Sequence, residues 1–197
     1  MVGAWPTIDA MASNEVRIIS GKWKGRKLRF PDRVDLRPTL GRVRGSLFNW
    51  LAADIRDSRC LDLYAGSGAL GFEALSRGAL ETVFVEHDRK VAAALKRNAG
   101  MLDANARVIT SAASKFLRMA QGSWQLILLD PPYESTELDI VLDLIAEREL
   151  LAPGGRVYFE RPRKAPLSFA IAGGKGGWSM LKHSHAADSQ FGLLARE

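Results

Sequence analysis

C-L-D-L-Y-A-G-S-G-A-L-G, residues 60–71, is the stretch that decides the fold of this chain. A short apolar run ends in Asp62, a glycine-rich turn follows, and a helical pattern begins at Gly71. Strand, glycine turn and helix together present backbone N–H groups and a helix N-terminus to one ligand. The spacing Gly66-x-Gly68-x-x-Gly71 matches the dinucleotide fingerprint. On its own this is a weak signal, because glycine also serves ordinary tight turns.

The position of Asp62 favours one class of ligand over another. Its carboxylate lies four residues before the first glycine and would repel a pyrophosphate, but it suits a ligand with an ammonium group. S-adenosylmethionine carries an ammonium group and a sulfonium charge, so we favour it over NAD. Glu86 ends the next expected strand, 18 residues after Gly68. An acid there either accepts hydrogen bonds from both ribose hydroxyls of an adenosine or is an ordinary exposed strand end.

Composition places the chain among globular proteins with one main domain and an anionic partner. Its 197 residues are 47% hydrophobic and 25% charged, with a formal net charge of +6. The lone Cys60 cannot form an internal disulfide and suits a reducing cytosol. No apolar run approaches the roughly 18 residues of a membrane span, and the start lacks the pattern of a signal peptide. We therefore expect a cytoplasmic protein with no membrane partner.

A basic stretch follows residues 1–14, which have no periodicity and are expected to be disordered. Residues 16–30 alternate around Gly21 and Gly25, which predicts a small β-hairpin. Cations interleaved with an aromatic residue such as Trp23 are typical of a surface that follows nucleic-acid phosphates; the alternative is a solvated strand face. The predicted RNA-binding residues are Arg17, Lys22, Lys24, Arg26, Lys27, Arg37, Arg42 and Arg44.

A helix is predicted to open at Pro38 and Thr39 and to bury Val43, Leu47 and Leu51. Arg42 and Arg44 are expected to lie off this apolar face, toward solvent or substrate. The chain then divides into a basic extension, residues 15–37, and a main domain, residues 38–197.

Strands and helices alternate through the main domain, which predicts an α/β fold with a mostly parallel sheet. The last two strands have no helix between them and predict a C-terminal antiparallel hairpin. Strands are expected at 82–86, 107–110, 124–130, 157–160, 178–183 and 191–195, and helices after 86, at 113–119 and at 138–151, the last stopped by Pro153-Gly154-Gly155.

Asp130-Pro131-Pro132-Tyr133 follows a near-continuous apolar strand. In a parallel sheet its carboxylate emerges at the same edge as the glycine turn. The prolines stiffen the turn and leave carbonyls exposed, so Asp130 and the carbonyls can accept both N–H bonds of a nucleobase amine while Tyr133 stacks on the ring. When both N–H bonds are held by acceptors, the nitrogen lone pair is free to attack a methyl group. Most of the rate acceleration would then come from orientation and preorganised electrostatics. The base must leave its stack to arrive there.

Together these motifs resemble the RsmD-type methyltransferases, which act on the N2 amine of a guanine in small-subunit ribosomal RNA. The resemblance rests on R-I-I-S-G-K-W-K-G-R-K-L (17–28), L-R-P-T-x-x-R-V-R-x-x-L-F-N-W-L (36–51), D-L-Y-A-G-S-G-A-L-G-F-E-A-L-S-R (62–77), V-E-H-D (85–88) and D-P-P-Y (130–133). The 17–51 stretch is the most specific part, because the glycine turn and D-P-P-Y occur in many amino-methyltransferases.

The resemblance implies a seven-stranded, Rossmann-like class I methyltransferase fold that binds S-adenosylmethionine. The substrate would be small-subunit ribosomal RNA, naked or within an assembling or assembled 30S subunit. We also expect a monomer without a metal site. Asp130, Pro131, Pro132 and Tyr133 would receive the guanine. The implied cofactor-binding residues are Asp62, Tyr64, Ala65, Gly66, Ser67, Gly68, Glu86, His87, Ala112, Ala113 and Asp130.

Three positions depart from the family pattern: Gly41 and Gly45 stand where acids are usual, and Ala112 where Asn or Asp is usual. Other functions therefore stay open. An adenine-N6 DNA methyltransferase would use the same D-P-P-Y chemistry. An NAD(P) oxidoreductase would share the glycine turn but leave residues 130–133 and the basic stretch unexplained. A catalytically weak RNA-binding relative follows if the three departures have removed the cofactor site.

Overall fold

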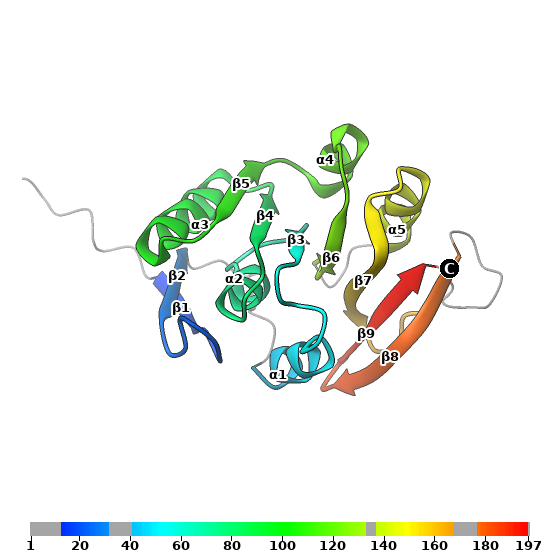
Figure 1. The fold of residues 1–197 in the computed structure, drawn as a ribbon, viewed down its shortest axis with the longest axis horizontal. Helices are drawn as coiled ribbons and strands as arrows, with labels where there is room; N and C mark the ends of the chain where they lie inside the picture. Colours follow the sequence, from blue (N-terminus) through cyan, green and yellow to red (C-terminus); the bar gives the residue numbers. More distant parts are fainter. Residues whose placement is uncertain (1–12, 32–40, 133–136, 168–176, 197) are drawn as a thin grey trace, which may run out of the picture.

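The computed structural model describes residues 13–31, 41–132, 137–167 and 177–196 (Figure 1). Its elements, in chain order, are β1 (Ser13–Arg17), β2 (Lys27–Pro31), α1 (Gly41–Trp50), β3 (Arg59–Asp62), α2 (Ala69–Ser76), β4 (Glu81–Glu86), α3 (Arg89–Leu102), β5 (Ala106–Thr110), α4 (Ala113–Met119), β6 (Trp124–Leu129), α5 (Glu137–Glu147), β7 (Leu151–Pro162), β8 (Trp178–Ala186) and β9 (Ser189–Arg196).

The main sheet has seven strands in the order β5-β4-β3-β6-β7-β9-β8. The pairings from β5 to β7 are parallel, whereas β9 runs antiparallel to both of its neighbours. The α/β fold with a mostly parallel seven-stranded sheet and a C-terminal antiparallel hairpin is thereby confirmed. The second strand of that hairpin, β9, inserts between β7 and β8, so β8 forms the edge of the sheet.

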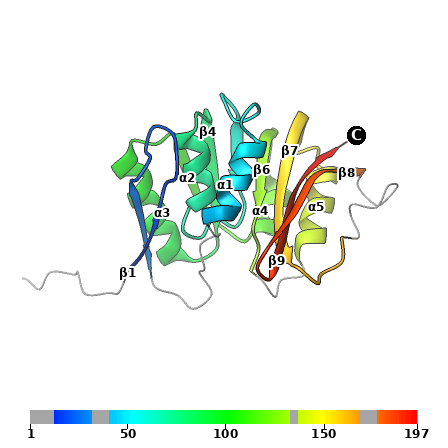
Figure 2. The same ribbon diagram turned by 90° about the horizontal axis from the view of Figure 1, so that it is seen from below.

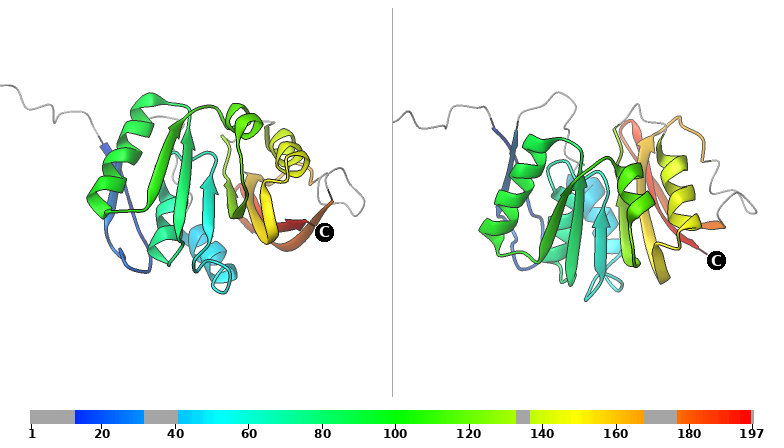
Figure 3. Two further views of the ribbon diagram at one scale, coloured as in Figure 1. Left: turned by 45° about the horizontal axis from the view of Figure 1, so that its top comes forward. Right: turned by 90° about the horizontal axis from the view of Figure 1, so that it is seen from above.

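Helices cover both faces of the sheet and enclose two cores. Side chains from α1 and α2, such as Leu47 and Phe72, pack with Leu128 and Tyr158 on one face. Side chains from α4 and α5, such as Leu117, belong to the core on the other face. In the right-hand view of Figure 3, α4 and α5 lie on the side of the sheet opposite to α1. This two-sided burial explains the near-continuous apolar strands.

The basic stretch forms the predicted β-hairpin, with β1 antiparallel to β2. β1 begins at Ser13, so the last two residues of the stretch expected to be disordered are ordered. Figure 2 shows the hairpin beside α3. Its inner face joins the first core through Ile18, Leu28 and Phe30. Trp23, the aromatic residue among the cations of this stretch, is only 8% exposed and belongs to the same core.

The prediction was also wrong where α5 gives way to β7. The helix ends at Glu147 rather than residue 151, and Pro153-Gly154-Gly155 lies inside β7 rather than after the helix. The register explains this: Trp124 pairs with Leu151, but Leu126 pairs with Arg156, so an irregularity in β7 accommodates the extra residues. The expected helix opening at 38–39 lies outside the described residues.

Candidate functional site

Three carboxylates follow one another along one edge of the sheet. Asp62 ends β3, Glu86 ends β4, and Asp130 comes directly after β6. β3 lies between the other two strands and is parallel to both, so all three residues lie at the carboxyl edge. The chain order reverses between β3 and β6, and ligands of open α/β sheets bind at such a switch point. The structure therefore brings the predicted acids together.

Two of these carboxylates hold the glycine loop. The N–H of Gly66 donates to Glu86 Oε2 at 3.0 Å, and the N–H of Gly71 donates to Asp62 Oδ2 at 3.0 Å. Asp62 is 1% exposed and Glu86 is 7% exposed. The two acids thus stabilise the loop by accepting backbone N–H groups, and they place acidic groups at the site.

The loop also satisfies part of its own backbone. The N–H of Gly68 donates to the carbonyl of Ala65 at 2.7 Å, and the N–H of Ala69 donates to Ser67 Oγ at 3.3 Å. These N–H groups were expected to face a ligand, as they do in phosphate-binding loops. Because they are engaged within the protein, the loop fits a cationic ligand better than a pyrophosphate. This observation weakens the NAD(P) alternative.

Glycine is required at Gly68, the residue before α2. Its φ is +78°, and an added Cβ would lie 2.6 Å from Phe72 Cδ2 and 2.7 Å from Leu95 Cδ2. A side chain there would be strained and would displace the core beneath the loop. α2 begins at Ala69, two residues before the predicted start at Gly71.

Burial is the main influence on the ionisation of Asp62. It raises the pKa of this carboxyl to about 7; the N–H of Gly71 lowers the pKa, and the charge of Glu86 raises it further. A carboxyl in this state becomes fully ionised when a cation arrives. A site with this property suits a ligand that carries a positive charge.

Glu86 links the loop to the start of α3. Its Oε1 accepts the N–H of Asp88 at 2.8 Å and lies 3.1 Å from His87 Nδ1. Asp88 in turn caps α3 by accepting from the N–H groups of Lys90 and Val91. His87 is exposed beside Glu86, so both residues implied by the resemblance lie at the same strand end.

The remaining predicted cofactor residues lie around the same edge. Ala112 is exposed and precedes α4 without a side-chain cap, whereas Ala113 is buried. The neighbouring Ser111 N–H donates to the carbonyl of Glu86 at 3.0 Å, which ties this turn to β4. An Asn or Asp at position 112 would cap α4; alanine does not.

Tyr64 connects the glycine loop with α5. Its hydroxyl donates to Glu137 Oε2 at 3.1 Å, and burial together with the charge of Glu137 raises the pKa of the phenol. Glu137 is the first residue of α5 and was not singled out from the sequence. The bond fixes the loop against the segment that follows the D-P-P-Y motif.

The D-P-P-Y motif leaves the sheet beside the loop. Asp130 is partly exposed, Pro131 is buried and Pro132 is exposed, while Tyr133 lies outside the described residues. Sequence reasoning missed a second carboxylate here, Glu160 of β7, although its position near the end of an expected strand was a usable signal.

The hairpin presents a basic surface. Among the predicted RNA-binding residues, Arg17, Lys22, Lys24, Arg26, Lys27 and Arg42 are exposed. A shallow groove of about 490 Å³ is lined by four cations, Gly25 and Met101 of α3; the cations are Arg17, Arg26, Lys27 and Arg29. Arg37 lies outside the described residues.

Arg44 does not belong to that surface, and its prediction as an RNA-binding residue is corrected. It is 4% exposed, and its Nη1 donates to the carbonyl of Arg17 at 3.1 Å. Burial lowers the pKa of its guanidinium, and the charge of Glu73 raises it. Arg44 therefore joins α1 to β1 inside the protein.

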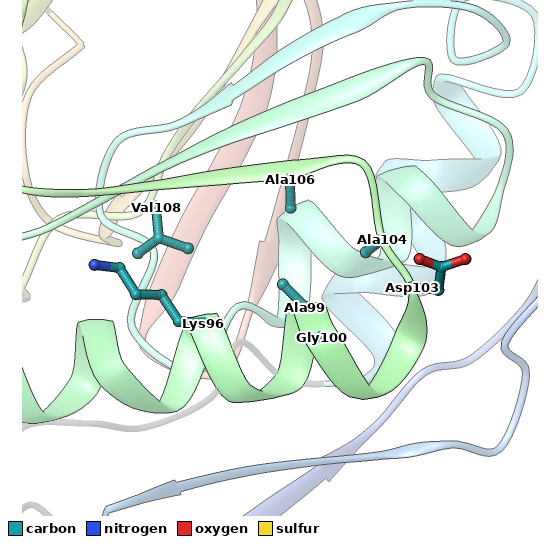
Figure 4. A pocket seen from close by; sticks show the side chains of 7 residues that line it. All are labelled: Lys96, Ala99, Gly100, Asp103, Ala104, Ala106 and Val108. Atoms are coloured by element: carbon teal, nitrogen blue, oxygen red, sulfur yellow. The ribbon is translucent and has the colours of Figure 1, made fainter.

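Gly41 and Gly45 of α1 leave open space. An added Cβ at either position would meet no atom within 4 Å, so an acid would fit at both. A separate hollow of about 400 Å³ lies between α3 and β5, lined by Lys96, Val108 and their neighbours (Figure 4). It contains none of the predicted site residues.

Within the described ranges, no group of three or more histidine, cysteine or acidic side chains could hold a metal ion. Over the same residues, no helix is both long and apolar enough to cross a membrane.

Comparison with known proteins gives one consistent result. Residues 16–193 match the family model described as Conserved hypothetical protein 95. The chain is 41% identical over 186 residues to "Ribosomal RNA small subunit methyltransferase D" of Escherichia coli K12, covering 94% of this chain and 92% of that protein.

Two solved structures are similar in fold. "Putative methyltransferase yhhF" from Escherichia coli superposes with a TM-score of 0.82 at 38% identity, covering 93% of this chain and 99% of that one. A Thermus thermophilus structure titled "16S rRNA N2 G1207 methyltransferase (RsmC) in complex with AdoMet and Guanosine" gives a TM-score of 0.72 at 20% identity, covering 98% of this chain and 52% of that one.

Proposed function

This chain belongs to the family described as Conserved hypothetical protein 95, and on that premise we propose that it methylates the N2 amine of a guanine in small-subunit ribosomal RNA. The protein is a methyltransferase, and its methyl donor is S-adenosylmethionine. One observation carries the proposal for the amine: Asp130 and Pro131 leave the sheet on β6, the strand adjacent to the one that ends in Asp62 and the glycine loop.

The residues present fit the cofactor. S-adenosylmethionine supplies a methyl group on a positively charged sulfur. The buried Glu86 and Asp62, which becomes ionised when a cation arrives, would provide negative charge beside the loop. Several N–H groups of the loop are engaged within the protein and would not repel a cation. We propose that Glu86 also holds the ribose hydroxyls, because a strand-end carboxylate can accept from both.

Asp130 and the Pro131 carbonyl orient the amine. When both accept its N–H bonds, the nitrogen lone pair is directed toward the methyl carbon, and a carboxylate disperses the positive charge that develops on nitrogen. The nitrogen would form one N–C bond as the carbon–sulfur bond of the methyl donor breaks, with the electron pair staying on sulfur. The nitrogen would also release one proton, for which Asp130 is the adjacent acceptor. We expect Tyr133 to stack on the base.

The substrate and the setting complete the proposal. The hairpin cations would bind ribosomal RNA phosphates, either in naked RNA or in a 30S particle. We place the enzyme in the cytoplasm, where ribosomal RNA and a reducing environment for Cys60 are found, and we expect it to act as a monomer.

The test measures transfer of a labelled methyl group to naked ribosomal RNA, 30S particles and duplex DNA, with binding of S-adenosylmethionine and NADH followed by calorimetry. We expect product on RNA, carried on guanine N2. Asp130→Ala should lower turnover by about 100-fold or more because it removes the group that orients the amine. Asp143→Ala, on the outer helix α5, is the matched control and should keep wild-type turnover.

Full turnover of Asp130→Ala with normal cofactor binding would refute the assigned mechanism. Methylation of adenine in duplex DNA, or tight binding of NADH in place of S-adenosylmethionine, would refute the assigned function.

A further inference from the structure

Glu160 lies beside Asp130 at the carboxyl edge of the sheet. β6 and β7 are parallel, with Leu128 opposite Tyr158 and Leu129 opposite Phe159. Asp130 follows Leu129 and Glu160 follows Phe159, so the register brings the two acids to the same height along the strand direction. Side chains alternate along a strand, and Leu128 and Tyr158 both belong to the core on the α1 face. Glu160, two residues after Tyr158 within β7, consequently faces that same side, and the charge of Asp130, directly after β6, acts on the same Tyr158 hydroxyl.

A buried phenol anchors Glu160. The hydroxyl of Tyr158, which is 0% exposed, donates to Glu160 Oε2 at 2.9 Å. Burial raises the pKa of Tyr158, and the charges of Glu160 and Asp130 raise it further. Burial also raises the pKa of Glu160, while hydrogen bonds from Tyr158 and Ser189 lower it. The hydrogen bond from Tyr158 thus orients the Glu160 carboxylate, and the residue is still partly exposed.

We infer that Glu160 accepts the N1–H of the guanine whose amine Asp130 holds, and so selects guanine over other purines. The inference rests on the proposed function. Guanine carries N1–H and the N2 amine side by side on its Watson–Crick edge, whereas a purine without a proton on N1 turns a lone pair toward the carboxylate. Neighbouring strands are about 4.8 Å apart, a spacing that lets two carboxylates contact adjacent donors of one base.

The alternative is that Glu160 only supports Tyr158 and Ser189 in the sheet. The two roles differ in what they predict for base selection. A site built around a hydrogen bond to the base rejects an analogue that lacks it, because a polar group is then left unpaired. A supporting role leaves the preference between two bases unchanged.

The experiment replaces the guanine that the wild-type enzyme methylates with 2-aminopurine, which keeps the 2-amino group but has no proton on N1. We expect wild type to prefer guanine by at least about tenfold in kcat/KM. Glu160→Gln should reduce that preference by at least about tenfold, because its amide can donate to N1, while the affinity for S-adenosylmethionine is unchanged. Glu147→Gln, exposed on α5, is the matched control and should retain the wild-type preference.

An unchanged base preference in Glu160→Gln would overturn the inference, whatever its turnover on guanine. If wild type used guanine and 2-aminopurine equally well, the inference would be overturned. This comparison needs no variant, so it remains decisive even if the Glu160→Gln protein does not fold. A wild-type enzyme that methylates no guanine would overturn the proposed function itself, and this inference with it.

Discussion

Asp62 shows how one buried residue couples stability to ligand binding. The unfolded chain releases the proton of this carboxyl near pH 3.8, but the folded protein retains it to about pH 7 because of burial. Between these values the folded state binds more protons than the unfolded state. The free energy of unfolding therefore falls as the pH rises from about 4 to 7.

Asp62→Asn should remove this pH dependence. The asparagine carbonyl can still accept the N–H of Gly71, but the side chain no longer titrates. We expect the variant to gain stability relative to wild type as the pH rises through this window, by roughly 3–4 kcal/mol at most given the shift from 3.8 to about 7. Urea unfolding of both proteins without cofactor, from pH 4 to 8, measures the difference. A difference that stays constant with pH would show that folded Asp62 is already ionised at pH 4.

Single residues also mark where sequence reasoning succeeded and failed. The acids at strand ends could be placed because a parallel sheet brings its carboxyl ends to one edge. Arg44 was wrongly predicted to lie on the RNA-binding surface, because its charge was given more weight than its position relative to the apolar residues of the helix. It precedes Leu47 by three residues and Phe48 by four, so on a helix it shares their buried face.

At the scale of elements, two helix glycines have opposite surroundings. Gly45 in α1 faces open space, whereas a Cβ on Gly71 in α2 would lie 2.3 Å from Phe84 Cε1 and 2.9 Å from Thr82 Cγ2. Gly71 therefore permits the close packing of α2 on β4. This is the third glycine of the fingerprint, and its reason lies in helix packing rather than in ligand contact.

Alanine at these two positions should change stability in opposite directions. Gly45→Ala gains helix propensity without a clash and should stabilise by about 1 kcal/mol, or about 2–4 °C in Tm. Gly71→Ala has the same propensity gain but must displace Phe84, so we expect a net loss of about 1–3 kcal/mol. Thermal unfolding of the pair measures both effects. If both variants shifted Tm by the same amount in the same direction, the close contact between Gly71 and Phe84 would have no effect on stability.

Most elements could be predicted because their pattern is local. The central strands β3, β4 and β6 are buried on both faces, and helices such as α3 have one apolar stripe. Both signals lie within a few residues. The boundary between α5 and β7 could not, because the irregularity around Pro153–Gly155 depends on which residues of β6 lie opposite. Register is a property of two strands, and one strand alone does not encode it.

At the scale of the molecule, the basic hairpin is built into the main domain. Glu73 of α2 is fully buried and accepts the N–H groups of Ile19 and Ser20 at 2.7 and 3.0 Å. Ser76 accepts the N–H of Trp23 at 2.9 Å. These partners are more than 50 residues apart, so sequence reasoning described a separate extension. The basic hairpin is thus hydrogen-bonded to α2, the helix that begins at the glycine loop.

The hairpin face should govern the salt dependence of RNA binding. Each phosphate contact releases a counterion, and removing one reduces the slope of log K against log salt by about 0.7–0.9. If Lys24 and Arg26, both exposed, each contact a phosphate, then Lys24→Ala with Arg26→Ala should reduce the slope by about 1.4–1.8. Filter binding to ribosomal RNA over a range of salt concentrations measures this.

The matched control is Lys115→Ala with Arg118→Ala, which removes two exposed cations from α4 on the opposite face of the sheet. It changes the net charge by the same amount as the hairpin variant. If RNA follows the hairpin, the control keeps the wild-type slope, and both proteins bind S-adenosylmethionine normally. Equal slopes for the two variants would mean that net charge alone attracts RNA, because a defined phosphate path must distinguish one face of the molecule from the other.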